Sequence, residues 1–186
     1  MDNLIKIEQQ SSHLSQTISD YRDFFRPDKP KVHFDVVSLI DHALVLIDHT
    51  LKNNSIHIEK TSLNNPILYT YRNEVLQVMI VLLKNSLDAF VENEILDGEI
   101  KIIIEKIEGV CSISFSDNAG GIAPDVVNKL FTPYFTTKQS SFGTGLGLYM
   151  SRLIIQEHCN GTIEVSSSAN NTTFRLNLPY EEESLC

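Results

Sequence analysis

The sequence predicts a domain that combines helices with strands, preceded by one long helix, and three observations support this prediction. Residues 4–25 carry apolar side chains at alternating steps of three and four, which is typical of a helix with a heptad seam. Residues 74–91 have the strongest helical periodicity, and residues 100–107 and 110–116 alternate as strands do. With 186 residues, the chain is long enough for one domain with a substantial core, or for that domain and a short appendage.

The first 30 residues are predicted to form a unit of their own. The heptad seam indicates a helix that pairs with a partner helix, although an amphipathic helix packed on its own domain would give a similar short pattern. Pro27 and Pro30 end this helix and mark a linker. We therefore divide the chain into residues 1–30 and a second domain at residues 31–182.

Shorter elements follow from local signals. Asp35 is placed to cap a helix that begins at residue 36, and Glu108-Gly109 predicts a hairpin turn. Pro124 starts a short helix, and Asn160 and Gly161 are suited to the left-handed end of the last helix. Further strands are expected at residues 56–59, 67–69, 162–165 and 172–178.

Charge and composition argue against several classes of function. The net charge of −9 disfavours a nucleic-acid groove, so no nucleic-acid partner is expected. No apolar run approaches the ~18 residues of a membrane span. We therefore expect a cytoplasmic chain without membrane contact, although its parent protein could be membrane-anchored. Cys111, Cys159 and Cys186 lack the spacing of metal ligands or of a disulfide framework, which favours free thiols.

Asp117 ends a predicted strand and begins the segment Asp117-Asn-Ala-Gly-Gly121. It shares the parity of Ile113 and Phe115, so its carboxylate should face the core and requires hydrogen-bond donors there. The glycines that follow allow another backbone or a ligand to approach closely. This segment therefore predicts the floor of a pocket.

The segment Gly143-Thr-Gly-Leu-Gly147 runs directly into a helix. Such a turn offers unpaired N–H groups and the positive end of the helix dipole to an anion. Neither the dinucleotide fingerprint nor the P-loop fits, so we expect a phosphate site of another kind. Residues 131–142 lie between the two glycine segments and predict a mobile lid with aromatic anchors and Lys138 near the phosphate. An ordinary loop with a solvated lysine is the alternative.

Asn85 falls on the apolar stripe formed by Val78, Leu82 and Ala89, and Asp88 lies one turn further along. An amide in an apolar stripe must find partners. It could be a capped or solvated residue at the edge of the stripe, or it could contact a ligand or metal. The two glycine segments favour the second interpretation.

Four segments resemble, in this order, the N, G1, F and G2 boxes of sensor histidine kinases: Leu-Leu-Lys-Asn85-Ser-Leu-Asp-Ala, Asp117-x-x-Gly-Gly, Phe131-x-Pro-Tyr-Phe-Thr-Thr-Lys and Gly-Thr-Gly-Leu-Gly-Leu. The ATP-binding domain of this family is shared with DNA gyrase, mismatch-repair ATPases and a heat-shock chaperone class. The resemblance covers about residues 31–180. It implies an α/β sandwich of the Bergerat type, with helices on one face of a mixed β-sheet. It also implies that residues 1–30 hold the second helix of a dimerisation and phosphotransfer hairpin, whose acceptor helix is absent from this chain.

The resemblance implies ATP and Mg²⁺ as cofactors. It assigns Asp117 to the adenine amino group, Gly121 to the close approach of the base, Thr172 to a place beside adenine, and Asn85 to Mg²⁺ between the phosphates. The other implied ATP contacts are Asp88, Thr137, Lys138, Gly143, Thr144, Gly145, Leu146 and Gly147.

Three departures from the family pattern limit the implied chemistry. Val81 stands where the family commonly has an Asn and where hydrolysing relatives have a Glu, and valine neither ligates Mg²⁺ nor activates water. Asn160 and Asn171 replace two frequent glycines. The sequence context of the phosphoacceptor histidine is missing at all six histidines, so no catalytic phosphoacceptor is expected here: His13, His33, His42, His49, His57 and His158.

The sequence therefore predicts the ATP-binding catalytic region of a sensor histidine kinase. Such a region transfers the ATP γ-phosphoryl group to a histidine on the dimerisation helices, for relay to an aspartate of a response-regulator receiver domain. The implied partners are that receiver domain and a second copy of this chain, bound through the N-terminal helix. The alternatives are a degenerate ATP site kept for dimerisation and docking, and a conformational ATPase.

Overall fold

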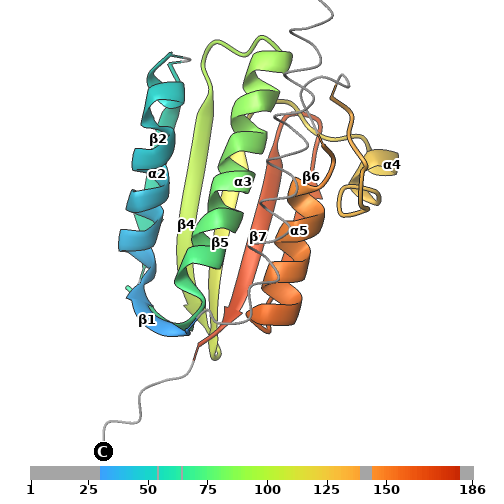
Figure 1. The fold of residues 1–186 in the computed structure, drawn as a ribbon. Helices are drawn as coiled ribbons and strands as arrows, with labels where there is room; N and C mark the ends of the chain where they lie inside the picture. Colours follow the sequence, from blue (N-terminus) through green and yellow to red (C-terminus); the bar gives the residue numbers. More distant parts are fainter. Residues whose placement is uncertain (1–29, 54, 64, 139–143, 181–186) are drawn as a thin grey trace, which may run out of the picture.

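Helices cover one face of a five-stranded sheet in the computed structural model, which describes residues 30–180 except 54, 64 and 139–143 (Figure 1). The strand order is β2–β4–β5–β7–β6. β2 runs parallel to β4, and the other neighbours are antiparallel. The strands are β2 (His57–Ser62), β4 (Glu99–Ile107), β5 (Val110–Asp117), β6 (Thr162–Ser167) and β7 (Thr172–Pro179). The predicted α/β sandwich with a mixed sheet is confirmed, whereas the predicted N-terminal helix and most of its linker lie outside the described residues.

The helical layer consists of elements far apart in the sequence. Its members are α2 (Val36–Asn53), α3 (Arg72–Glu92), α5 (Gly147–Leu153) and the π-helix η1 (Ile154–His158), which continues α5. A short α4 (Pro124–Val127) begins at the predicted proline. Two further strands, β1 (Val32–Asp35) and β3 (Ile67–Thr70), pair antiparallel in a separate small sheet. None of the described helices has the length and apolarity needed to cross a bilayer.

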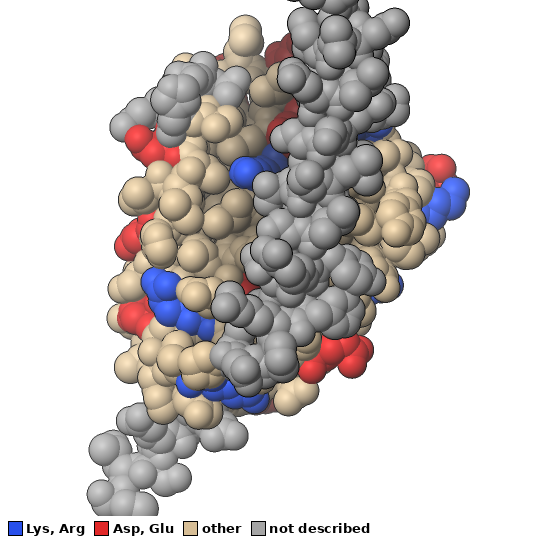
Figure 2. Space-filling model, viewed as in Figure 1, with Lys and Arg blue, Asp and Glu red and all other residues tan. Residues whose placement is uncertain are grey.

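The core lies between the sheet and the helices. Alternate residues of β4 and β5 face this core and are fully buried, among them Ile102, Ile104 and Ile113. The residues between them, such as Lys101 and Ser116, lie on the opposite face, as expected for a sheet with one solvated side. In Figure 2, acidic and basic side chains are interspersed with uncharged ones over the visible surface.

The turns follow the glycine and asparagine signals. Glu108 and Gly109 both have positive φ, 45° and 78°, so they join β4 to β5 in the predicted hairpin. Asn160 takes the left-handed conformation with φ 53°, whereas Gly161 and Asn171 do not. Gly161 is required for another reason, since a Cβ there would lie 2.3 Å from the carbonyl oxygen of Asn177.

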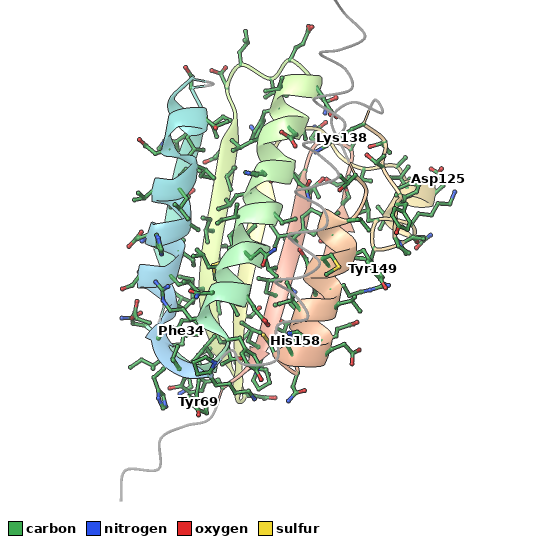
Figure 3. The ribbon with its side chains drawn as sticks, viewed as in Figure 1. Phe34, Tyr69, Asp125, Lys138, Tyr149 and His158 are labelled. Carbon is green, nitrogen blue, oxygen red and sulfur yellow. The ribbon has the colours of Figure 1, made fainter. Side chains whose placement is uncertain are left out.

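A polar contact joins two helices at the end of the helical layer that is farther from Lys138 (Figure 3). His158 Nδ1, at the end of η1, lies 2.8 Å from Oε2 of Glu74 in the first turn of α3. Glu74 is only 3% exposed, so this contact satisfies a carboxylate within the packed layer. It fixes the end of η1 to the beginning of α3.

Asp35 caps α2, as predicted: its Oδ1 accepts the backbone N–H of Ser38 at 2.5 Å. Burial raises the pKa of Asp35, but the hydrogen bonds from Ser38 and other groups outweigh burial and hold the pKa below its ordinary value. We expect Asp35→Ala to lower the free energy of unfolding by about 1 kcal/mol at pH 7 in urea titrations. Since the folded pKa is lowered, this contribution is present above the unfolded pKa and is lost as the pH falls through the folded pKa.

Asp35→Asn is the matched control for this prediction. It keeps an oxygen that can accept the Ser38 N–H but cannot titrate, so it should retain most of the stability and lose the acid dependence. Equal stability of Asp35→Ala and wild type at pH 7 would show that the cap contributes nothing.

Candidate functional site

A pocket of about 500 Å³ lies among the second half of α3, the loop after β5, the segment before residue 139 and the start of α5. These elements are the ones that carry the four motifs of the sequence. The residues that line the pocket come from positions between 81 and 174 of the chain, and most of the predicted site residues are among them.

Asp117 ends β5 and lines this pocket with a side chain that is 5% exposed. The Ser86 hydroxyl donates to its Oδ2 at 2.6 Å, and the backbone N–H of Ala119 donates to its Oδ1 at 3.1 Å. The expected donors are thus present. Burial raises the pKa of Asp117, and the two hydrogen bonds oppose that shift. Because a carboxylate oxygen has two lone pairs, each oxygen retains acceptor capacity toward the pocket.

Thr172 lies directly opposite Asp117 in the β5–β7 ladder and lines the same pocket. Gly121 also lines it, but the close approach that this glycine permits is to the protein's own backbone. A Cβ on Gly121 would lie 1.5 Å from the carbonyl oxygen of Ser168, in the turn between β6 and β7. The N–H of Gly121 donates to the Ala169 carbonyl at 3.1 Å, so the loop after β5 is fixed to that turn.

Asn85 is half-buried in the pocket wall, and its amide nitrogen has no hydrogen-bond partner among the described residues. Buried amides are nearly always satisfied, and Asn85 lines the pocket, so its side chain is a candidate for contact with a ligand bound there. One turn along α3, Oδ2 of Asp88 lies 2.5 Å from Nζ of Lys138. Thr137 lines the pocket beside this pair. The structure therefore brings Asn85, Asp88 and Lys138 to one pocket, as predicted.

The glycine segment borders the pocket through Thr144, Gly145 and Gly147, and α5 begins at Gly147. Leu146 does not line the pocket, and its carbonyl accepts the N–H of Met150 at 2.9 Å. Gly145 has φ 66°, and a Cβ on it would lie 2.4 Å from the carbonyl carbon of Tyr134. The turn is therefore packed against the predicted lid. Gly143 lies outside the described residues.

The described part of the predicted lid, residues 131–138, contains neither helix nor strand, as expected. Phe135 lines the pocket, and Phe131 packs against the core with Arg152 5.5 Å from its ring centroid. Tyr134, however, is 75% exposed, so it is not among the aromatic anchors predicted for residues 131–142. Phe142 lies outside the described residues, and movement of the lid stays a prediction.

Several pocket residues were not identified from the sequence. Glu92 continues the helical repeat of Val81, Asn85 and Asp88, and this spacing could have revealed it. Phe174 lies two residues after Thr172 on the same face of β7. The other residues missed are Lys84, Ser86, Ala89, Asn93, Gly120, Ile122, Ala123, Val126, Leu130, Thr136 and Leu148.

The residues present fit Mg²⁺ only if it enters together with phosphate groups. The described part of the chain has no group of three or more His, Cys, Asp or Glu side chains arranged to hold a metal ion. Mg²⁺ is commonly bound through one or two side-chain oxygens together with waters and substrate phosphates. Asn85 and Asp88 could supply such oxygens, whereas Val81 cannot.

Comparisons with known proteins point to one family of ATPases. The family model for histidine kinase-, DNA gyrase B- and HSP90-like ATPases matches residues 70–182. The C4-dicarboxylate transport sensor protein DctB of Rhizobium meliloti (strain 1021) is 44% identical over 102 residues, which make up 55% of this chain and 16% of DctB. The sensor histidine kinase ZraS of Escherichia coli (strain K12) is 30% identical over 173 residues, 91% of this chain and 36% of ZraS. The chain thus spans well under half the length of either relative.

Solved structures share the fold. The catalytic domain of the histidine kinase ThkA has a TM-score of 0.71 and 28% identity, and the match covers 81% of this chain and 95% of that one. ThkA in complex with the response regulator protein TrrA has a TM-score of 0.72 and 23% identity, over 94% of this chain and 50% of that one. Since the family model matches more than half of the chain and includes the whole pocket, the chain belongs to the histidine kinase-, DNA gyrase B- and HSP90-like ATPase family, as the ATP-binding domain of a sensor histidine kinase.

Proposed function

We propose that the pocket binds ATP with Mg²⁺ and presents the γ-phosphoryl group to a histidine on the dimerisation helices of the kinase, for relay to a response-regulator aspartate. One observation carries this proposal. The same pocket holds the buried acceptor carboxylate of Asp117 together with the unpartnered amide of Asn85, the Lys138 ammonium and a glycine turn that begins a helix. A purine with an exocyclic amine and a phosphate tail matches this combination of groups.

The base would be recognised at Asp117. An ionised carboxylate only accepts hydrogen bonds, so it pairs with the exocyclic amino group of adenine and disfavours a base with a carbonyl oxygen in that position. Apolar side chains such as Ile122 and Phe174 line the same pocket and could pack on the ring faces. Thr172 adds a hydroxyl next to the carboxylate.

The phosphates would be held by Lys138, the Asn85 amide and the N–H groups at the start of α5. Lys138 would exchange its present partner, Asp88, for a phosphate oxygen. Bound Mg²⁺, held by Asn85 and Asp88, would neutralise phosphate charge. Phosphoryl transfer depends mostly on such positioning and charge neutralisation. Val81 provides no base, which disfavours attack by water.

The proposal includes two protein partners. ThkA was solved in complex with a response regulator, and we propose that a receiver domain is also the partner of this kinase. The predicted helix within residues 1–30 would pair with a second copy of the chain and precede the ATP-binding domain at residues 31–182.

Calorimetric titration with ADP and with a non-hydrolysable ATP analogue tests the proposal. We expect binding at one site per chain that strengthens when Mg²⁺ is added. The degenerate-site alternative, motivated by Val81, predicts no Mg²⁺-dependent binding, and a conformational ATPase would release phosphate steadily from ATP. With labelled ATP we expect no acid-labile phosphohistidine on these 186 residues, because the acceptor context is missing from them.

Lys138→Met is expected to weaken binding of the triphosphate analogue about 10-fold, because it removes one charge-assisted contact. The effect on adenosine should be small, because adenosine has no phosphate. Titrations with both ligands at low and high salt measure the difference, which should shrink at high salt. Lys129→Met, at an exposed lysine that does not line the pocket, is the control. If Lys138→Met lost affinity for adenosine and for the triphosphate analogue by the same factor, a contact between Lys138 and phosphate would be ruled out.

A further inference from the structure

Ser86 lies on α3 immediately after Asn85, and it is 3% exposed. Its hydroxyl donates to Oδ2 of Asp117 at 2.6 Å, across the interface between α3 and the end of β5. A buried hydroxyl that donates to a carboxylate is a charge-assisted contact, shorter and stronger than one between neutral groups. Ser86 therefore acts on the ionised form of Asp117.

The two oxygens of Asp117 are held separately. Ser86 fixes Oδ2, and the N–H of Ala119 fixes Oδ1 at 3.1 Å. The carboxylate therefore cannot rotate within the pocket without losing one of these bonds. Both bonds favour the charged form of the carboxylate over the neutral acid.

Few groups determine the pKa of Asp117. Burial raises its pKa, the Ser86 and Ala119 hydrogen bonds lower it, and no charged side chain in the described ranges is among the causes. Ala119 contributes a backbone N–H, which a substitution cannot remove simply. Ser86 is therefore the side chain through which the protonation state of Asp117 can be changed.

On the basis of the proposed nucleotide site, we infer that Ser86 is a positioning residue that keeps the Asp117 carboxylate a pure hydrogen-bond acceptor. In this way Ser86 sets the preference of the pocket for 6-aminopurine over 6-oxopurine nucleotides. A carboxylate accepts from a 6-amino group and repels the lone pairs of a 6-oxo group. A neutral carboxyl group has an O–H that can donate to the 6-oxo group. Loss of the Ser86 hydroxyl should thus reduce the discrimination between the two bases.

The first test needs no nucleotide. Carbon-13 NMR of the side-chain carboxyl of Asp117 gives the midpoint of its titration in wild type and in Ser86→Ala. The midpoint should rise by about 1 pH unit in the variant, because a hydrogen bond to a charged group has been removed. Ser114→Ala is the matched control, since this serine lies on β5 near Asp117 but its hydroxyl donates to the Ile103 carbonyl, at 3.5 Å. Its midpoint should equal that of wild type.

Ser86→Thr separates the hydrogen bond from packing. Threonine keeps the hydroxyl, so the midpoint should return toward the wild-type value. A midpoint in Ser86→Ala that equals wild type, or one in Ser86→Thr that equals Ser86→Ala, would overturn the inference.

The second test measures affinity for ADP and for IDP, its 6-oxo counterpart, at one pH below and one pH above the Asp117 midpoints that the NMR titrations give. From the higher to the lower pH, Ser86→Ala should lose ADP affinity several-fold more than wild type does, and its preference for ADP over IDP should become smaller. An unchanged preference and pH profile in Ser86→Ala would overturn the inference. If wild type bound no ADP, the proposed function would fail, while the NMR midpoint would still report on the effect of Ser86.

Discussion

Replacing Asp117 with alanine is expected to weaken MgADP binding about 100-fold. The substitution removes the acceptor for the adenine amino group. It also leaves two buried donors, the Ser86 hydroxyl and the Ala119 N–H, without their partner. Calorimetric titration measures the loss, and circular dichroism checks that the domain remains folded.

The control is Asp125→Ala, which removes an exposed carboxylate from α4 (Figure 3). Its MgADP affinity should match that of wild type. An Asp117→Ala variant that binds MgADP as tightly as wild type would remove the basis of the proposed function.

The same carboxylate should reduce stability at neutral pH. Burial raises the folded pKa of Asp117, so the stability linked to its protonation is present below the unfolded pKa and is lost as the pH rises through the folded pKa. Asp117→Asn cannot ionise, and it should therefore be more stable than nucleotide-free wild type at pH 7.5. Urea titrations should show this advantage shrinking as the pH is lowered toward 4.

Gly121→Ala is expected to lower the free energy of unfolding by about 3 kcal/mol or more, and to abolish nucleotide binding. The added Cβ would lie 1.5 Å from the Ser168 carbonyl oxygen, so the loop after β5 and the β6–β7 turn must separate. That separation also breaks the bond between the Gly121 N–H and the Ala169 carbonyl. Urea denaturation and ADP titration measure the two effects.

Gly109→Ala is the matched glycine control. Its Cβ would have only the Tyr180 carbonyl oxygen nearby, at 3.7 Å, so the variant is penalised by its positive φ of 78° alone. We expect a loss of about 1 kcal/mol and unchanged ADP binding. If Gly121→Ala were no less stable than Gly109→Ala, the close contact at Ser168 would be relieved without cost.

The predictions that were confirmed depend on local periodicity. The parity of Ile113, Phe115 and Asp117 correctly placed the carboxylate on the buried face, because a strand alternates its side chains strictly. The helical stripe placed Asn85 and Asp88 beside the same pocket for a similar reason.

The predictions that failed or stayed incomplete depend on contacts between distant segments. A glycine can admit a ligand or a backbone, and only the packing of Ser168 against Gly121 shows that a backbone occupies that space. The hydrogen bond from Ser86 to Asp117 was not predicted, because it depends on how α3 packs on β5. The aromatic residues of segment 131–142 were predicted as anchors without distinction, but an irregular segment has no period that fixes which side chains face inward, and Tyr134 is exposed.

The contact between His158 and Glu74 has a mechanical consequence. It joins the end of η1 to the first turn of α3, at the end of the helical layer that is farther from Lys138 (Figure 3). If the two helices separate around the pocket, we expect the smallest displacement at this contact. A rotation of α3 by about 5° about this contact would move Asn85, which lies roughly 16 Å further along α3, by about 1.4 Å. That displacement is enough to break a hydrogen bond made by Asn85.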